Sequence, residues 1–300
     1  MAAYVIGVDV GYGNTKTSHN CFSSGVKKLP GKPPLATRVI ETTDGFYAIG
    51  NGKVSVQKSK TEDENMRVLT MAAIAEELKK TGTTVADVHL GVGVPRTRMG
   101  AEKKDFVDYY TKNRLIFKYE DVQYSVTLLS VDVFPQGYAG IVSFMKDFHK
   151  SALVIDIGSW TVDILPLTEF IPDQTRCKSL PLGTITCMND INEALRQNLG
   201  QEADETTIKE VMIYGTSDIP KDYLDIIKTG LTSYATNLMD QIRALNFNSD
   251  LTQFIFIGGG ATIMKHFLSE ADKKNALILD DVSINAKGYE ELIRHKMGGR

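Results

Sequence analysis

Short apolar runs alternate along the chain with longer stretches of helical periodicity. Most consecutive positions are apolar in the stretches expected to form buried strands, which are residues 4–10, 88–94, 152–157 and 254–257. Apolar side chains recur at every third or fourth position in the stretches expected to form the longest helices, which are residues 64–80, 184–199 and 221–244. Strands that alternate with helices in this way predict an α/β fold.

Shorter elements complete the pattern and indicate how the sheets are built. Further strands are expected over residues 15–21, 36–41, 46–49, 115–119, 122–130, 161–166, 176–180 and 276–280. Further helices are expected over residues 100–113, 136–149, 205–213 and 288–296. Each half of the chain begins with two strands joined by a tight turn. Because hairpins are antiparallel and strand–helix–strand units are parallel, the sheets should be mixed.

Two stretches, one in each half of the chain, resemble one another. Residues 5–15 are VIGVDVGYGNT, and residues 153–161 are LVIDIGSWT. Each runs from an apolar strand through an aspartate and a glycine to a threonine that opens a second strand. Asp9 and Asp156 lie 156 − 9 = 147 residues apart, which is about half of the 300 residues. A repeat of this length predicts two similar domains rather than a solenoid.

The aspartate and glycine of each turn predict a site for phosphate and Mg²⁺. Glycine lets the backbone approach a ligand closely, and the exposed N–H groups of a turn can hold phosphate oxygens. Asp9 and Asp156 are suited to hold Mg²⁺ through its water molecules, because Mg²⁺ prefers carboxylate, water and phosphate oxygens. Two such turns that faced each other would clamp a triphosphate between two domains.

A third glycine turn follows the apolar strand over residues 254–257. Gly258, Gly259 and Gly260 come directly after it, and a helix is expected to begin next. Glycine permits close contact with a base or a phosphate, and the start of a helix is electropositive. Together with the two aspartate turns, these glycines predict a site for an adenosine group.

Composition and charge narrow the class of partner. The chain has 34 Lys and Arg against 37 Asp and Glu, so its net charge of −3 indicates no general affinity for nucleic acid or anionic membranes. The one strongly basic stretch, residues 27–38, is rich in proline and is interpreted as a surface loop. The three cysteines and five histidines lack the spacing of a disulfide framework or a zinc site. With no signal-like segment and no membrane-spanning apolar run, we expect a soluble cytoplasmic protein.

At this point the sequence resembles the actin, sugar-kinase and DnaK-type chaperone ATPase superfamily. The two aspartate turns, the helix expected at Gln136 and the GGGAT turn occur in that family's order. Within the superfamily, the chain is most similar to the ParM-type (StbA) bacterial actins. Five stretches carry this similarity: residues 67–78 (RVLTMAAIAEEL), 91–95 (GVGVP), 133–139 (VFPQGYA), 156–163 (DIG and TVD) and 285–289 (NAKGY).

The resemblance implies an actin-like fold with two similar domains, each built on a mixed sheet flanked by helices, and a nucleotide cleft between them. Residues 1–149 with 281–300 would form the first domain, and residues 150–280 the second. It also implies that Mg²⁺ with ATP or GTP binds to both turns. Asp9 and Asp156 would organise the hydrated Mg²⁺. The phosphate-binding residues would be Gly11, Gly13, Asn14, Thr15 and Lys16 in the first turn, and Gly158, Ser159 and Thr161 in the second.

Further site residues follow from the same resemblance. Gln136 stands where family members carry a Glu or Gln that orients the attacking water, and a glutamine would position this water rather than act as a base. Slow hydrolysis would follow. Lys209 and Glu210 resemble the Lys-Glu pair near the adenine and ribose in actins. Gly183 is expected at a turn near the nucleotide. Gly258, Gly259 and Gly260 would contact the adenosine.

Two parts of the chain depart from the family pattern. Ser159 and Trp160 replace the smaller residues that are usual in the second phosphate turn, so the role of Trp160 stays open. Residues 22–64 match the family poorly. Because that region helps to form filament contacts in actins, the architecture of any filament cannot be transferred to this chain.

The resemblance implies a bacterial filament protein that polymerises with Mg-ATP or Mg-GTP and hydrolyses the nucleotide. It would segregate plasmid DNA through a DNA-binding adaptor protein, because the near-neutral charge argues against direct DNA binding. Two alternatives stay open within the same fold. One is a small-molecule kinase or a phosphatase, for which Asp163 is the nearest candidate base. The other is a non-polymerising nucleotide switch or chaperone-like ATPase.

Overall fold

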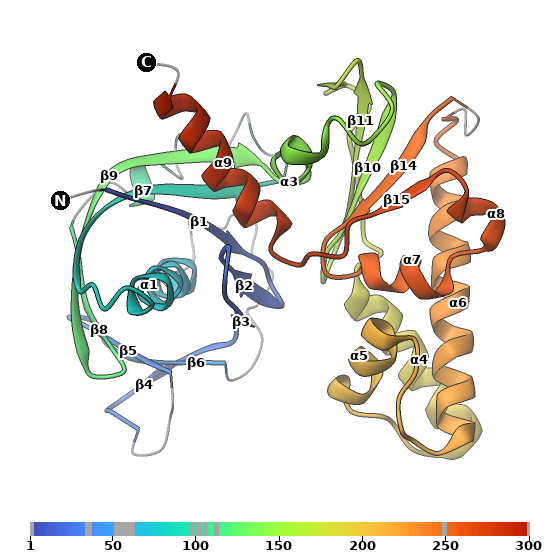
Figure 1. Ribbon diagram of the computed structural model, residues 1–300. Coiled ribbons are helices and arrows are strands. Elements are labelled where there is room, and N and C mark those ends of the chain that lie inside the picture. The colour runs from blue at the N-terminus through green and yellow to red at the C-terminus, as the bar shows by residue number, and fades with distance from the viewer. Residues whose placement is uncertain are drawn as a thin grey trace. The chain divides into compact units, whose positions relative to one another are not determined.

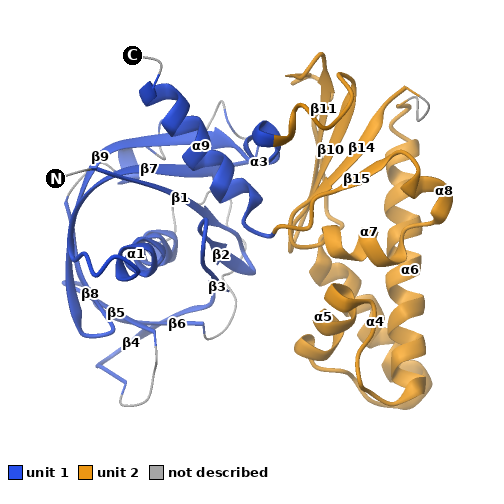
Figure 2. Ribbon diagram, in the orientation of Figure 1, with its two compact units in different colours: residues 1–143, 282–300 blue, residues 144–281 orange. Residues whose placement is uncertain are grey.

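The computed structural model describes residues 3–33, 38–50, 64–95, 99, 104, 107–110, 114–247 and 251–298 (Figure 1). The chain divides into two compact units, and each is described by itself. Unit 1 comprises residues 1–143 and 282–300, and unit 2 comprises residues 144–281 (Figure 2). The last segment of the chain therefore belongs to the same unit as the first. None of the helices in the described ranges is both long enough and apolar enough to cross a membrane.

Unit 1 is built on a mixed sheet whose order, over the described residues, is β3-β2-β1-β7-β9-β8-β5-β6-β4. Its strands are β1 (Tyr4–Val10), β2 (Asn14–Lys16), β3 (Cys21–Ser23), β4 (Val26–Leu29), β5 (Val39–Thr42), β6 (Gly45–Ile49), β7 (Val85–Val94), β8 (Leu115–Tyr119) and β9 (Val122–Pro135). Strands β1, β7 and β9 run parallel at its centre, and the outer pairings are antiparallel. The prediction of a mixed sheet is confirmed here.

Helix α1 (Glu64–Lys79) lies inside the curve of this sheet (Figure 1). Ten of its sixteen residues are buried, including Leu69, Ile74 and Leu78, which are 0% exposed. Such a helix is apolar around most of its circumference, because the sheet encloses it instead of covering one face. It supplies much of the core of unit 1.

Helix α9 (Ile284–Gly298) covers the outer face of the sheet, and glycines let it approach closely. A Cβ atom added to Gly7 would lie 2.0 Å from the carbonyl oxygen of Ala286, and one added to Gly93 would lie 1.8 Å from Tyr289 Oη. Neither position can carry a side chain unless the helix moves away. The GVGVP and NAKGY stretches are therefore two sides of one packing contact.

Unit 2 is built on a second mixed sheet, with the order β12-β11-β10-β14-β15 and β13 paired to β11 over the described residues. Its strands are β10 (Ala152–Ile157), β11 (Val162–Thr168), β12 (Ile171–Pro172), β13 (Lys178–Leu180), β14 (Gln253–Ile257) and β15 (Ala276–Ile278). Its helices are α4 (Thr184–Leu199), α5 (Glu205–Tyr214), α6 (Lys221–Arg243), α7 (Ala261–Phe267) and α8 (Glu270–Lys273). The core of unit 2 joins the apolar faces of β10, β11 and β14 to helices α4 to α7.

The internal repeat is visible in the strand pairing. In unit 1, β1 pairs antiparallel with β2 and parallel with β7. In unit 2, β10 pairs antiparallel with β11 and parallel with β14. Asp9 lies opposite Lys16 in the first hairpin, and Asp156 lies opposite Asp163 in the second. The two hairpins thus share one register, and the aspartates hold the same position in each.

Several elements differ from the sequence-based expectation. The strand predicted over residues 122–130 extends to Pro135, and the helix predicted over residues 136–149 is reduced to α3 (Tyr138–Ile141) with a 3₁₀ turn (Val142–Phe144). Glycine at positions 137 and 140 weakens the helix, while parallel pairing with β7 extends the strand. The strand expected over residues 15–21 is split into β2 and β3. Most of the helix expected over residues 100–113 lies outside the described residues.

Candidate functional site

The first aspartate turn connects β1 to β2 in unit 1. The Gly11 backbone N–H donates to the Asn14 carbonyl at 3.0 Å and closes a four-residue turn. A Cβ atom at Gly11 would lie only 2.9 Å from that same oxygen, so the tight turn requires glycine. Gly13 and Asn14 are partly exposed, whereas Asp9 beneath them is 4% exposed. The turn therefore presents backbone above a buried carboxylate.

Two of the predicted site residues meet at the Asp9 carboxylate, one of them seven residues away in sequence and the other 127. Gln136 Nε2 donates a hydrogen bond to Asp9 Oδ1 at 2.7 Å. Lys16 Nζ lies 3.4 Å from Asp9 Oδ2. A buried carboxylate needs such partners, because burying a charge is costly unless it is paired and hydrogen-bonded. Asp9, Lys16 and Gln136 thus form one cluster within unit 1, and their role at a phosphate and Mg²⁺ site stays a prediction.

The backbone around Gln136 fixes where its side chain points. Gln136 follows β9, and its N–H donates to the Val94 carbonyl at 2.9 Å. Gly137 has φ +77°, a conformation that favours glycine, and its N–H donates to Asn285 Oδ1 at 3.0 Å. Asn285 belongs to the NAKGY stretch at the start of α9 and is 5% exposed. The α9 segment thus supports the loop that carries Gln136.

Thr15 takes part in this turn through its backbone rather than through its side chain. It is 0% exposed, and its hydroxyl shares a hydrogen bond of 2.8 Å with Ser24 Oγ. The Ser24 N–H also donates to the Gly13 carbonyl at 3.0 Å. The Ser24 contacts thus hold β2 in place from the β3 side. Sequence analysis did not identify Ser24, because nothing in the local sequence distinguishes it from its neighbour Ser23.

The second aspartate turn has the same backbone hydrogen bond as the first. The Gly158 N–H donates to the Thr161 carbonyl at 2.9 Å, which matches the bond between Gly11 and Asn14. The side chains differ, because Asp163 stands where the first turn has Lys16. Thr161 Oγ1 donates to Asp163 Oδ2 at 3.3 Å. The second turn therefore gathers two carboxylates, a set of ligands suited to a hydrated cation.

Gly183 lies against the second turn, at the start of α4. A Cβ atom there would come within 2.3 Å of the Trp160 carbonyl carbon and 2.4 Å of the Ser159 carbonyl carbon, so no side chain fits. The first N–H groups of α4 bond to the turn: Thr184 donates to the Gly158 carbonyl and Ile185 to the Ser159 carbonyl, each at 3.0 Å. Trp160 is 39% exposed and therefore does not belong to the core.

The three glycines after β14 lie in different surroundings. Gly258 has φ +85°, and a Cβ atom there would lie 2.4 Å from Asp156 Oδ1. Gly260 donates its N–H to the Ile157 carbonyl at 3.0 Å, and its Cβ atom would overlap the Ile157 side chain at 2.2 Å. Gly259 is exposed and has open space where a Cβ atom would lie. The outer two glycines pack against the second aspartate turn, while the middle one faces solvent.

Lys209 and Glu210 lie on α5, which is distant in sequence from the glycines of residues 258–260. Lys209 Nζ forms an ion pair with Glu205 Oε1 at 2.7 Å, one turn earlier on the same helix. Glu210 is exposed. Helix α5 is tied to α7, which begins after Gly260, through a hydrogen bond of 2.9 Å between His266 Nε2 and the Ile213 carbonyl. A role of Lys209 and Glu210 at an adenosine group stays a prediction.

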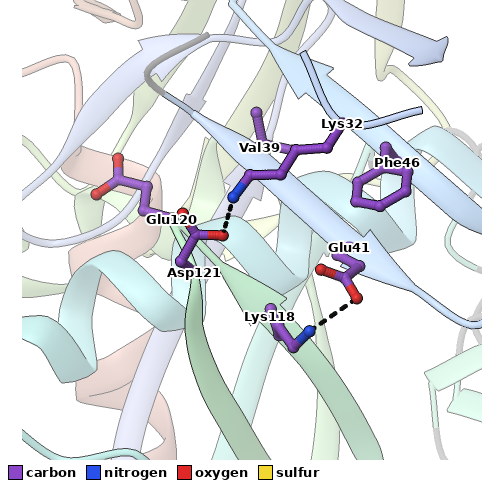
Figure 3. A pocket seen from close by; sticks show the side chains of 7 residues that line it. All are labelled: Lys32, Val39, Glu41, Phe46, Lys118, Glu120 and Asp121. Atoms are coloured by element: carbon purple, nitrogen blue, oxygen red, sulfur yellow. Dashed lines mark hydrogen bonds and ion pairs between the residues drawn. The ribbon is translucent and has the colours of Figure 1, made fainter. Parts of the chain in front are cut away.

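Two pockets lie away from the predicted site residues. One in unit 1, of about 130 Å³, is lined by charged side chains that are already paired. Figure 3 shows Lys32 directed at Asp121, at 2.5 Å, and Lys118 directed at Glu41, at 2.9 Å. The other, of about 630 Å³, is a groove between α4 and α6 in unit 2. Neither is lined by a residue of the aspartate turns.

Comparison with protein families assigns each unit separately. Residues 7–138 match the N-terminal domain of actin-like proteins. Residues 154–270 match the C-terminal domain of the MreB-like archaeal actin homologues. The first match falls within unit 1 and the second within unit 2. Together they cover both aspartate turns and the glycine turn after β14. No curated protein matches the chain.

Solved structures confirm an actin-like fold along the whole chain. An archaeal actin homologue matches with a TM-score of 0.78 and 19% identity, over 98% of this chain and 100% of that one. A 15-stranded ParM filament from Clostridium botulinum matches with a TM-score of 0.74 and 18% identity, over 98% and 100% of the two chains. The actin-like protein Alp7A matches with a TM-score of 0.81 and 13% identity, over 100% and 98%. The archaeal homologue is also known in complex with ADP.

Proposed function

The chain belongs to the actin-like proteins, and from this membership we propose that it binds Mg-ATP or Mg-GTP, assembles into filaments and hydrolyses the nucleotide there. The observation that carries the proposal is the cluster of Asp9, Lys16 and Gln136 beneath the first turn. It brings together a carboxylate, a cation and an amide, which are the groups needed to organise Mg²⁺, phosphate and water.

Each aspartate turn takes a defined part in nucleotide binding. Backbone N–H groups of the two turns, other than those of Gly11 and Gly158 that already donate within the turns, would hold phosphate oxygens, and the Lys16 ammonium would add a point charge at the β- or γ-phosphate. Asp9 and Asp156 would hold the hydrated Mg²⁺. The metal supplies charge neutralisation on the phosphates during hydrolysis. Gly183, Lys209, Glu210 and the glycines of residues 258–260 serve the nucleoside end of the ligand.

Gln136 positions the water that attacks the γ-phosphate. Its Nε2 is engaged by Asp9, which leaves the amide oxygen as the group that can accept a hydrogen bond from water. An amide oxygen orients water without removing its proton at an appreciable rate, so turnover is slow. Slow turnover suits a filament that has to persist between assembly and disassembly.

Filament formation and its use in the cell extend the proposal. A structural relative of this chain is a 15-stranded ParM filament, which supports self-association of the same fold. We propose that the filament moves plasmid DNA in the bacterial cytoplasm and reaches the DNA through a DNA-binding adaptor protein. The net charge of −3 supports an adaptor, because direct binding to DNA favours a basic surface.

Light scattering combined with phosphate release tests the proposal. Protein over a range of concentrations is mixed with Mg-ATP or Mg-GTP, and both signals are followed in the same sample. We expect scattering to rise above a critical concentration, with phosphate release following assembly. Turnover without scattering, at a rate per molecule independent of concentration, would instead favour a monomeric enzyme or a nucleotide switch. Absence of both signals with either nucleotide would contradict the proposal.

A further inference from the structure

A glutamate on the central helix of unit 1 contacts the turn that follows Lys16. Strand β2 ends at Lys16, and residues 17–20 turn the chain back into β3. Glu77 lies on α1, near its C-terminal end, and its side chain is 10% exposed. Its carboxylate accepts hydrogen bonds from this turn. The contact joins a residue of the core helix to the segment beside the proposed phosphate-binding lysine.

The Glu77 carboxylate binds three residues of the turn. Oε1 accepts hydrogen bonds from Thr17 Oγ1, from Asn20 Nδ2 at 2.9 Å and from the His19 backbone N–H at 3.3 Å. Oε2 lies 2.9 Å from His19 Nδ1. Burial raises the pKa of Glu77, but the hydrogen bonds from Thr17 and His19 together lower it by more. The pKa of Glu77 therefore lies below its usual value. Hydrogen bonds to a charged acceptor are about twice as strong as neutral ones.

Glu77 is itself held in place by the helix that carries it, and the residue before Lys16 is held as well. Helix α1 is enclosed by the sheet, and Ala73, Ile74 and Leu78 around Glu77 are 0% exposed. On the other side of Lys16, the hydroxyl of Thr15 is bonded to Ser24. β2 is only three residues long and Lys16 is its last residue, so contacts on both sides of Lys16 help to fix where the lysine lies, together with its pairing to Asp9 and Cys21.

We propose that Glu77 is a positioning residue for Lys16, which fixes the turn of residues 17–20 so that the lysine ammonium stays beside Asp9 and within reach of the nucleotide phosphates. This inference rests on the proposed function, because the phosphate contact of Lys16 belongs to it. Lys16 Nζ is held near Asp9 at 3.4 Å, a distance that a shift of the strand end by about 1 Å would change substantially.

The neighbouring glutamate provides a matched control. Glu76 is nearly as buried, with a side chain 14% exposed, and it is also engaged by hydrogen bonds and charge. Its partners are Tyr119 Oη at 2.6 Å and Arg38 Nε at 3.4 Å, neither of which touches the turn after Lys16. Truncation of either glutamate removes a comparable carboxylate from the same helix. Only Glu77 should affect the nucleotide.

The dissociation constant of Mg-ATP, or of Mg-GTP if that binds better, tests the inference below the critical concentration for assembly. We expect E77A to bind the nucleotide about tenfold more weakly, which is the effect of losing one hydrogen bond to a charged group. E76A should bind it like the wild type. Both variants should lower the melting temperature. If Glu77 acts through Lys16, E77A should weaken binding no further in a K16A background. Equal binding by E77A and E76A would overturn the inference.

A conservative variant and a nucleotide-free measurement make the outcome unambiguous. E77Q keeps an oxygen for Thr17 and Asn20, so its binding should be intermediate; it also serves if E77A does not fold. Amide hydrogen exchange of residues 16–20 in the free protein should accelerate in E77A and not in E76A. If the wild type binds no nucleotide, the proposed function fails, and the exchange result then decides separately whether Glu77 anchors the turn. Unchanged exchange in E77A would exclude even that role.

Discussion

The two aspartate turns share a backbone but differ in the groups around their carboxylates. Each turn closes with a hydrogen bond from a glycine N–H to the carbonyl three residues later, at 3.0 Å in unit 1 and 2.9 Å in unit 2. In the first, Asp9 is buried beneath the side chains of Lys16 and Gln136. In the second, Asp156 is partly exposed, lies opposite Asp163 and has Gly258 against its carboxylate.

This difference indicates that the two copies of the repeat share their backbone structure, while their side chains suit different ligands. The first turn supplies a cation and an amide, which suit phosphate and water. The second supplies two carboxylates, which suit a hydrated metal ion, and the exposed Gly259, where open space leaves room for a flat group to approach. A substitution at matching positions should therefore have different consequences in the two units.

The largest effect is expected from the glycines that support the second turn. Gly258→Ala places a Cβ atom 2.4 Å from Asp156 Oδ1 in a backbone with φ +85°, so we expect a loss of about 3 kcal/mol or more in the free energy of unfolding. Gly259→Ala is the control, because its Cβ atom meets open space, and it should change stability by less than about 0.5 kcal/mol. Urea unfolding measures both. Similar losses at the two positions would contradict the packing described for Gly258.

The aspartates themselves should govern turnover in both units. Asp156→Asn and Asp9→Asn each remove a charge that the proposed function assigns to Mg²⁺, so we expect hydrolysis to fall about a hundredfold or more. Asp9→Asn also leaves Lys16 beside a neutral amide, which should make its binding defect less sensitive to added Mg²⁺ than that of Asp156→Asn. Phosphate release at several Mg²⁺ concentrations measures this. Wild-type turnover in Asp156→Asn would exclude a metal role for that turn.

A smaller effect is expected at Gln136, which follows β9 and contacts Asp9 in unit 1. Gln136→Ala removes the water-positioning amide and the hydrogen bond to Asp9 Oδ1, and we expect hydrolysis to slow by about 10- to 100-fold. Nucleotide binding should stay close to the wild-type level, because Lys16 still neutralises Asp9. Single-turnover hydrolysis and equilibrium binding separate the two quantities. Loss of binding as well would show that Gln136 acts mainly by holding Asp9.

The sequence predicted those features of the fold and site that depend on local pattern. Alternating strands and helices, the repeat and the glycine turns appear as short-range regularities, so the mixed sheets and the position of each turn could be read from them. Helix α4, expected over residues 184–199, has those bounds in the structure. The resemblance to ParM-type actins identified Gln136 as a candidate site residue. In the structure its side chain is hydrogen-bonded to Asp9, which lies 127 residues away in sequence.

Long-range contacts explain what the sequence could not predict. The helix expected over residues 136–149 was too long, because Gly137 and Gly140 weaken it, and the strand expected over residues 122–130 was too short, because pairing with β7 extends β9 to Pro135. Glu77 lies in a run of small and apolar residues beside a second glutamate, and nothing local distinguishes the two. Their partners, the turn after Lys16 for one and Tyr119 for the other, are set by tertiary packing.

The smallest effect concerns the pH dependence of stability in unit 1, because Glu77 accepts hydrogen bonds from the turn that follows Lys16. Its pKa in the folded state lies below the ordinary value, so the ionised carboxylate contributes stability above its unfolded pKa and loses it as pH falls through the folded pKa. The amide introduced by E77Q does not titrate in this range. We therefore expect E77Q to be less stable than the wild type by about 1 kcal/mol at pH 7, with the difference in stability closing below about pH 4.

E193Q is the control in unit 2, because Glu193 is exposed beside Arg196, and solvent screening makes such pairs weak. Urea unfolding from pH 3 to pH 7 measures the gap, and a gap that widened toward acid would contradict an ionised Glu77 that is hydrogen-bonded to the turn of residues 17–20.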